Sequence, residues 1–446
     1  MQTIYESKVF PLNTTVSDNN HLEIGGCDIV ELAKQFGTPL YVYDERTLRT
    51  QAQGFLESFG RYYPNSKVVY ACKAFINIPL ARYLADLGLG FDVVSGGELA
   101  ILKAANVDLA TVDFHGNNKT PQEIWNALEW GVGHFVIDSF HELELLNEFA
   151  NQQGIIQRVL VRVSPSIDPH THRLTTTGVL DSKFGFPIET GQAHEAVRTV
   201  LKCSNLTLEG LHFHLGSPIF ELEPYTEAIE LVLGFAAEMK KEGLLLNRFS
   251  PGGGFAIAYT EDDDPPSKDA YAKAITQALI EGCKINGLSQ PELTIEPGRS
   301  MSGPAGVAVY TVGAIKEIPN VRTYVSVDGG MGDNIRPALY GSQYIAVLAN
   351  QPTANPTETV TIAGKYCESG DVLVTDAKLP KVKPNDIIAI PASGAYAPSM
   401  ASTYNMNGKP PIVMVNDGTT RLIRRRESFE DMMSQDITDP MAKDPL

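Results

Sequence analysis

Short apolar runs rich in β-branched and aromatic residues alternate with amphipathic stretches between about residues 66 and 296. Such runs are typical of buried strands, and apolar residues recurring every three or four positions are typical of packed helices. We predict eight strands, at residues 66–72, 90–94, 111–115, 133–138, 157–163, 207–213, 246–250 and 292–296. Helical patterns separate them, for example at residues 79–87, 97–105, 121–130, 225–241 and 269–283. This alternation predicts an α/β fold, a closed parallel (β/α)8 TIM barrel.

Beyond residue 296 the pattern changes to strand-like runs that are separated by turns rather than by helices. These runs lie at residues 307–315, 322–327, 359–362, 386–391, 412–415 and 421–423. They indicate a β-rich C-terminal domain of the β-sandwich or β-barrel kind. A chain of 446 residues exceeds the usual size of one core. We therefore expect the barrel at residues 45–300 and the β-rich domain at residues 1–44 plus 301–446.

Composition narrows the class of protein. The net charge of -17 argues against binding to nucleic acid, because phosphate backbones attract clustered Lys and Arg. No apolar run is long enough to cross a membrane, and residues 1–8 lack the basic start and apolar core of a secretory signal. The five cysteines are scattered rather than paired. We expect a cytoplasmic globular protein.

Lys73 directly follows the first predicted barrel strand. A lysine at the end of a buried strand can lose its proton through desolvation and condense with an aldehyde, for which pyridoxal 5'-phosphate is the obvious candidate. Most lysines in such places only solvate the end of the element. The hypothesis therefore depends on the ends of the other strands, where barrel active sites form.

Three later strand ends carry unusual residues. His214 to Ser217 follow one strand, and Gly252, Gly253 and Gly254 follow the next, where backbone N–H groups can approach a phosphate closely. The last strand runs into Glu296, Pro297, Gly298 and Arg299, and a carboxylate here can keep a pyridine nitrogen protonated. The alternatives are a structural histidine, a flexible glycine turn and a Glu296–Arg299 ion pair.

The β-rich domain carries further candidates. Arg336 can bind a carboxylate through two hydrogen bonds, Glu368 can meet an ammonium group, and Cys367 can donate a proton. Each of these residues has a plain alternative as a surface charge or a buried thiol.

Taken together, eight segments resemble diaminopimelate decarboxylase, a family of the alanine-racemase-like (fold-type III) class of pyridoxal phosphate enzymes. In order along the chain they are YACKA at 70–74, DPHTH at 168–172, SKFG at 182–185, HFHLGS at 212–217, GGG at 252–254, EPGR at 296–299, CESGD at 367–371 and GAY at 394–396. The resemblance covers nearly the whole chain. Phe75, where the family commonly has asparagine, Pro218, where it has glutamine, and Lys365-Tyr366 before Cys367 depart from it.

The resemblance implies a role for each matching residue. Lys73 would condense with the cofactor, His214 would stack on its ring, and Glu296 would pair with the pyridine nitrogen. Arg336 and Glu368 would bind the substrate, and Cys367 would protonate the carbon that carbon dioxide leaves. The phosphate end would be held by Ser217, Gly253, Gly254, Pro297, Gly298, Arg299 and Tyr396, and further substrate contacts would come from Arg299, Tyr340 and Tyr396. A homodimer with shared sites is implied.

By this resemblance the chain would be a lyase that decarboxylates meso-2,6-diaminopimelate to L-lysine, the final step of lysine biosynthesis. Alternatives are related decarboxylases of ornithine, arginine, carboxynorspermidine or a D-diamino acid. Glu368 stands where relatives that take ornithine tend to have aspartate, and Arg336 favours a second carboxylate on the substrate. A racemase or a non-catalytic cofactor carrier agrees less well with Glu296 and with the second domain.

Overall fold

The computed structural model describes residues 3–168 and 176–437, so part of the DPHTH segment, residues 169–172, lies outside the described residues. The chain forms two compact units. One comprises Thr47–Pro304, and the other combines Met1–Arg46 with Ala305–Leu446. Each unit is described by itself below.

The first unit contains a closed barrel of eight parallel strands, as predicted. Its strands pair in the order β6, β7, β8, β9, β10, β12, β13 and β14, and β14 pairs again with β6. The bounds are β6 Ser66–Ala71, β7 Gly90–Val93, β8 Val112–Phe114, β9 His134–Ile137, β10 Gln157–Ser164, β12 Leu206–His212, β13 Arg248–Ser250 and β14 Glu292–Ile295. All eight predicted strands are present, and a short strand, β11 (Phe186–Pro187), pairs with β10.

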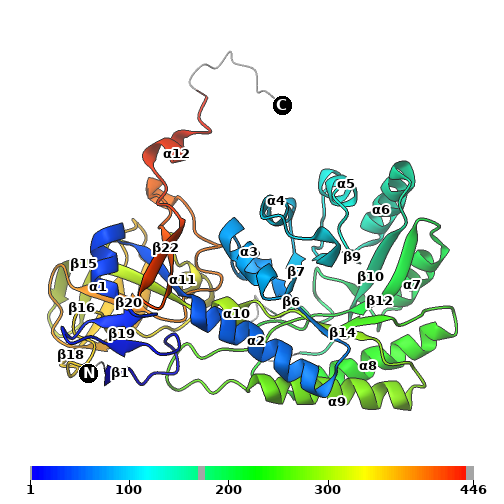
Figure 1. Ribbon diagram of the computed structural model, residues 1–446, viewed down its shortest axis with the longest axis horizontal. Coiled ribbons are helices and arrows are strands. Elements are labelled where there is room, and N and C mark those ends of the chain that lie inside the picture. The colour runs from blue at the N-terminus through cyan, green and yellow to red at the C-terminus, as the bar shows by residue number, and fades with distance from the viewer. Residues whose placement is uncertain (1–2, 169–175, 438–446) are drawn as a thin grey trace. The chain divides into compact units, whose positions relative to one another are not determined.

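Helices follow the strands and surround the barrel (Figure 1). They are α2 Glu45–Tyr62, α3 Ile78–Asp86, α4 Gly96–Ala104, α5 Pro121–Glu129, α6 Phe140–Gln153, α7 Gln192–Lys202, α8 Glu223–Lys240, α9 Lys268–Ile285 and the short α10 Arg299–Ser302. The start of several is fixed by a side-chain cap: Ser95 accepts a hydrogen bond from the backbone N–H of Glu98, and Thr120 forms a capping box with Glu123. These caps hold each strand-to-helix turn in a defined place.

The N-terminal end of the barrel is filled by a buried polar cluster. Arg248 donates to both carboxylate oxygens of Asp113, at 2.9 and 2.7 Å, and its Nη1 lies 2.7 Å from Nδ1 of His134. Burial alone would raise the pKa of Asp113, but the Arg248 guanidinium and His134 outweigh it and hold that pKa below its ordinary value. Because catalysis in such barrels occurs at the opposite end, this cluster stabilises the fold.

The second unit is built on a mixed sheet, which agrees with the predicted β-rich domain. The long strand β15 (Gly306–Ile318) pairs with β5 (Leu40–Asp44), β16 (Arg322–Val327) and β20 (Ile387–Ile390). The sheet continues through β18 Glu358–Ala363, β19 Val372–Leu379, β21 Ile412–Asn416 and β22 Thr419–Arg424, with β17 Val347–Leu348 pairing with β20. All six predicted strands are present. A small sheet of β1 Thr3–Ile4, β2 Thr15–Val16, β3 Leu22–Ile24 and β4 Cys27–Asp28 precedes α1 Ile29–Phe36.

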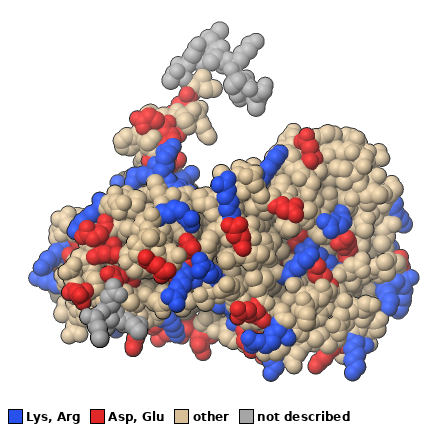
Figure 2. Space-filling view, viewed as in Figure 1, with Lys and Arg blue, Asp and Glu red and all other residues tan. Residues whose placement is uncertain are grey.

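The prediction missed strands β5, β17 and β19 of this sheet, of which β19 is the longest. Its sequence, VLVTDAKL, contains three polar residues, and Asp376 has a φ of 54°, which interrupts the regular pattern. Two short helices, α11 Arg336–Tyr340 and α12 Phe429–Met433, complete the unit. No helix in the described part of the chain is long and apolar enough to cross a membrane. On the face shown in Figure 2, basic and acidic side chains are interspersed.

Candidate active site

Lys73 lies in a 3-10 turn, Cys72–Ala74, immediately after β6, and its side chain is 37% exposed. Its Nζ is 4.0 Å from Oδ2 of Asp92 on the neighbouring strand β7, and the Asp92 side chain is fully buried. The turn is packed against the EPGR segment, since the N–H of Ala71 donates to the carbonyl of Pro297 at 3.3 Å. A Cβ added at Gly298 would lie 2.9 Å from the Ala71 side chain, so only glycine allows this approach.

Glu296 directly follows β14, at the same end of the barrel as Lys73. Its carboxylate accepts a hydrogen bond from the Ser250 hydroxyl at 2.7 Å and lies 3.2 Å from Nε2 of His212. Burial alone would raise the pKa of Glu296, but His212, the Ser250 hydroxyl and Lys73 outweigh it, so the pKa is lowered. Glu296 is therefore a preformed anion, and the alternative of a Glu296–Arg299 ion pair is not needed to explain its position, because Ser250 and His212 already hold it.

His214 and the three glycines form one side of the site. The N–H of Gly253 donates to Nδ1 of His214 at 3.3 Å, which fixes the ring and its tautomer. Burial lowers the pKa of His214 well below its ordinary value, and Lys73 and Arg162 lower it further, so the ring is neutral. Gly252 and Gly254 have φ values of 75° and 106°, and a Cβ added at Gly253 would lie 2.1 Å from the carbonyl oxygen of Glu296. The alternative of a flexible glycine turn does not agree with this close packing.

Ser217 and Arg299 meet at the rim of the barrel. Nε of Arg299 donates to the Ser217 hydroxyl at 3.0 Å, and Nη1 donates to the Tyr259 hydroxyl at 2.5 Å. Only 5% of Arg299 is exposed. A buried guanidinium held by two hydroxyl groups is an environment that suits an anion.

The barrel residues fit pyridoxal phosphate. An amine at Lys73, a neutral ring at His214 and a carboxylate at Glu296 all lie at the C-terminal ends of strands, which is where such barrels bind their ligands. The buried oxygens of Asp92 and Nε2 of His115 have no hydrogen-bond partner among the described residues, which is typical of a site built around a ligand.

In the second unit, the structure brings together three of the predicted residues. Arg336 begins α11 and is 5% exposed, and its Nε donates to the Tyr344 hydroxyl at 2.9 Å. Its guanidinium carbon lies 5.8 Å from the centre of the Tyr340 ring and 5.7 Å from that of Tyr396. Two aromatic rings therefore hold the guanidinium, which leaves a defined direction for a carboxylate.

Cys367 and Glu368 are placed differently, because both are exposed on a loop between β18 and β19. The loop is held by Asp371, whose carboxylate accepts from the N–H of Tyr366 at 2.8 Å and from the N–H of Met331 at 2.6 Å. A Cβ at Gly364 would meet that carboxylate at 2.1 Å. Asp371 thus ties the Cys367 loop to the segment that leads into Arg336.

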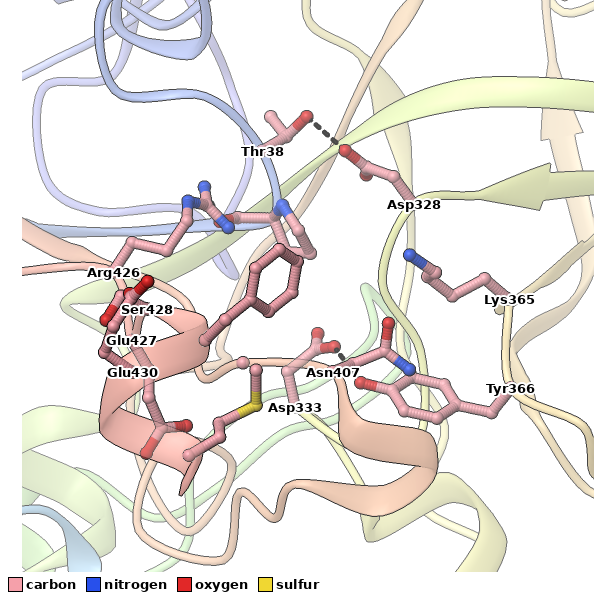
Figure 3. A pocket seen from close by; sticks show the side chains of 14 residues that line it. Thr38, Asp328, Asp333, Lys365, Tyr366, Asn407, Arg426, Glu427, Ser428 and Glu430 are labelled. Atoms are coloured by element: carbon pink, nitrogen blue, oxygen red, sulfur yellow. Dashed lines mark hydrogen bonds between the residues drawn. The ribbon is translucent and has the colours of Figure 1, made fainter. Parts of the chain in front are cut away.

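A cavity of about 420 Å³ lies in the second unit beside this loop (Figure 3). Lys365 and Tyr366 line it, together with Asp328, Asp333 and Arg426. The Tyr366 hydroxyl faces the carboxylate of Asp333 at 3.5 Å, and the Tyr310 hydroxyl donates to the same carboxylate at 2.6 Å. Burial raises the pKa of Asp333 to about 7. The departures Lys365-Tyr366 noted in the sequence therefore shape this cavity.

Sequence reasoning missed four buried barrel residues near the predicted site: Asp92, His115, His212 and Ser250. Each lies in a strand or immediately after one, and each contacts Lys73, Glu296 or Asp92. A polar residue at the C-terminal end of a barrel strand is itself a signal, and Asp92 within the apolar run FDVV was the clearest instance. The pairing of strands decides which of these side chains meet.

Comparison with known proteins defines the class. Residues 46–303 match the family described as pyridoxal-dependent decarboxylase, pyridoxal binding domain, so the cofactor is pyridoxal phosphate. Over 96% of its length the chain is 43% identical to diaminopimelate decarboxylase of Halalkalibacterium halodurans, 97% of which is covered. The chain belongs to the diaminopimelate decarboxylase family, whose members are carboxy-lyases, as the sequence motifs predicted.

Solved structures agree with this assignment. Diaminopimelate decarboxylase from M. jannaschii in co-complex with L-lysine has a TM-score of 0.90 and 38% identity, with 96% of this chain and 98% of that chain covered. Diaminopimelate decarboxylase from Helicobacter pylori complexed with L-lysine has a TM-score of 0.82 and 32% identity, with 91% and 98% covered. The similarity therefore includes both structural units.

Proposed function

We propose that the chain decarboxylates meso-2,6-diaminopimelate to L-lysine and carbon dioxide, the final step of lysine biosynthesis. The observation that carries the proposal is the joint placement of Lys73 and the preformed Glu296 anion at the same end of one barrel. Membership of the diaminopimelate decarboxylase family and its resemblance to two lysine-bound structures support the substrate and product.

The barrel residues bind and orient the cofactor. The Lys73 amine would hold the cofactor through its aldehyde, and the Glu296 carboxylate would support a proton on the pyridine nitrogen. When bound, pyridoxal phosphate supplies an electron sink for the pair of electrons that carbon dioxide leaves behind. His214 would offer a neutral ring for stacking, and the barrel's phosphate contacts would come from Ser217, Gly253, Gly254, Pro297, Gly298 and Arg299. Tyr396, a residue of the second unit, is proposed as a further phosphate contact.

The second unit provides the residues that choose the substrate. The Arg336 guanidinium, held between Tyr340 and Tyr396, binds the carboxylate that is retained in lysine. Glu368 binds the distal ammonium group, Arg299 and Tyr396 contact the reacting amino acid, and the Cys367 thiol donates the proton that replaces carbon dioxide. Ornithine and arginine lack the second carboxylate, so a buried guanidinium at this position disfavours them.

The proposal also includes the oligomeric state of the protein and its location. Cys367 and Glu368 are exposed on their loop, which suits residues that complete the site of a second subunit in a homodimer. The five free, scattered cysteines suit a cytoplasmic protein.

A direct assay tests the function and the cofactor site together. Purified protein supplied with pyridoxal phosphate should release carbon dioxide from meso-diaminopimelate much faster than from ornithine, arginine or carboxynorspermidine. Borohydride reduction followed by peptide mapping should find the cofactor on Lys73. Faster release from another diamino acid would overturn the substrate, and an adduct on a different lysine would overturn the site.

A further inference from the structure

Asp92 is the feature of the barrel that the proposed function leaves unexplained. It lies in β7, its side chain is fully buried, and neither of its carboxylate oxygens has a hydrogen-bond donor among the described residues. A buried carboxylate without a donor is costly, and folded proteins keep such a group only where something compensates it. A cationic group lies beside it, because Nζ of Lys73 is 4.0 Å from Oδ2 of Asp92.

The other groups around Asp92 cannot compensate a negative charge. Burial raises the pKa of Asp92 well above its ordinary value, the charge of Lys73 opposes that rise, and the nearby carboxylates add to it. The charged and titratable groups that face it are Lys73, Cys72, Glu98, Asp113, Glu296 and His115. Lys73 is the sole cation of this set, so the charge of Asp92 depends on the proton carried by Lys73.

His115 separates the two carboxylates of the site. Its Nε2 lies 4.0 Å from Oδ1 of Asp92 and 3.8 Å from Oε1 of Glu296. Burial lowers the pKa of His115 well below its ordinary value, and His212 and Lys73 lower it further, so the ring is neutral. Glu296 has its own stabilising partners in His212 and Ser250, whereas among the described residues the cation beside Asp92 is Lys73.

We propose that Asp92 is the counter-ion of the Lys73 nitrogen, which retains its proton because Asp92 lies opposite it. This inference rests on the proposed role of Lys73. The pair is neutral overall: the ammonium and the carboxylate gain or lose their charges together when one proton moves from nitrogen to oxygen. Asp92 is a positioning residue that acts through Lys73, and its effect extends to the nitrogen after it has bonded to the cofactor aldehyde.

The first test uses the cofactor-free protein and measures Lys73 alone. Trace acylation with acetic anhydride across a pH series, read out by mass spectrometry of the Lys73 peptide, reports how much of the amine is unprotonated. In Asp92→Asn the proton should leave at lower pH, so acylation near neutral pH should be roughly tenfold faster than in the parent. Equal rates of Lys73 acylation in the parent and in Asp92→Asn would mean that Asp92 carries no charge. The proposal would then be wrong.

A matched variant separates this pair from a general effect of charge. Glu98 is a second, partly buried carboxylate that acts on Lys73 coulombically, but its Oε2 accepts a hydrogen bond from the N–H of Val94 at 2.8 Å. Glu98→Gln should change Lys73 acylation much less than Asp92→Asn. An equal change in both variants would assign the effect to the overall charge of the site rather than to Asp92.

The second test uses the loaded protein and needs no turnover. The absorption spectrum of bound pyridoxal phosphate depends on whether the nitrogen that Lys73 contributes is protonated, so its pH titration should move to lower pH in Asp92→Asn. Asp92→Ala should give the same shift, and Asp92→Glu should restore part of it. An unchanged midpoint in both neutral variants overturns the proposal.

The two possible failures can be told apart. If borohydride reduction and peptide mapping find the cofactor on a lysine other than Lys73, the proposed site, and with it the proposed function of Lys73, is wrong. If the cofactor is on Lys73 but neither acylation nor the spectral midpoint responds to Asp92, only the counter-ion inference is wrong. Circular dichroism of each variant shows whether the barrel is folded, and Asp92→Ala replaces Asp92→Asn if the amide disturbs packing.

Discussion

The two units of this protein hold their functional residues in opposite ways. In the barrel, Glu296 is buried and is already held by Ser250 and His212, and the His214 ring is fixed by Gly253. In the second unit, Cys367 and Glu368 are exposed on a loop, and Asp371 orders the backbone of that loop rather than their side chains. The barrel is preorganised for its cofactor, whereas the loop presents groups whose partners come from elsewhere.

This difference agrees with the role proposed for each unit. A cofactor that stays bound through every cycle is best served by rigid strand ends, where electrostatic stabilisation costs no rearrangement. A substrate that enters and leaves each time needs groups that are reachable from solvent. Arg336 combines both properties, because it is buried like the barrel residues but belongs to the unit that is proposed to bind the substrate.

The largest effect is expected where the preorganised charge is removed. Glu296→Gln keeps the shape of the side chain but removes the anion that Ser250 and His212 support. The variant should bind pyridoxal phosphate and release carbon dioxide at least roughly a hundredfold more slowly than the parent. Single-turnover assays with a spectrum of the bound cofactor measure both properties. Release at the parental rate would make Glu296 a structural residue and would remove the contrast between the units.

A mixed dimer tests whether the exposed loop serves another subunit. If Lys73 and Cys367 come from opposite subunits of a two-fold dimer, the Lys73→Ala and Cys367→Ala dimers should each be nearly inactive. Denaturing and refolding an equimolar mixture should make about half of the dimers mixed, each with one intact site, so activity should return to roughly a quarter of the parental value. No recovery in proven mixed dimers would place both residues in the site of the same subunit.

Arg336→Ala should act on substrate binding alone. The KM for diaminopimelate should rise by roughly tenfold or more, because a charge-assisted carboxylate contact is lost, while the spectrum of the bound cofactor stays unchanged. Steady-state kinetics with diaminopimelate and ornithine measure the selectivity. If both substrates lost the same factor, Arg336 would have no part in choosing the second carboxylate. Arg322→Ala, at a partly exposed arginine of β16, is the control.

The smallest effect concerns stability and lies in the second unit. Burial raises the pKa of Asp333 to about 7 from 3.8, so between these values the unfolded chain releases a proton that the folded chain keeps. The free energy of unfolding therefore falls as the pH rises through this interval, by roughly 4 kcal/mol at most for this group. Asp333→Asn cannot ionise and should lack this part of the slope. Thermal unfolding of both proteins at about pH 5 and about pH 8 measures it. A difference between the two proteins that does not grow with pH would contradict the assignment.

The pattern of apolar residues was sufficient to predict the barrel and most of the second sheet. Buried parallel strands are continuous apolar runs, so residues 66–72 and 292–296 could be recognised without knowledge of their neighbours. Strand β19 escaped because the bulge at Asp376 places polar residues in its middle. Its register is determined by pairing with β18, which local sequence does not reveal.

The sequence by itself determined which chemical groups are available: a lysine and a glutamate at strand ends, a glycine triplet for a phosphate, and a cysteine and an arginine in a second domain. Only the tertiary structure decided that Asp92 lies opposite Lys73, that a neutral His115 separates it from Glu296, and that Asp371 links the Cys367 loop to the Arg336 segment. The physical reason is that the role of a buried polar group depends on the strand beside it. Partners of this kind are brought together by closure of the barrel and by strand register, and they are far apart in the chain.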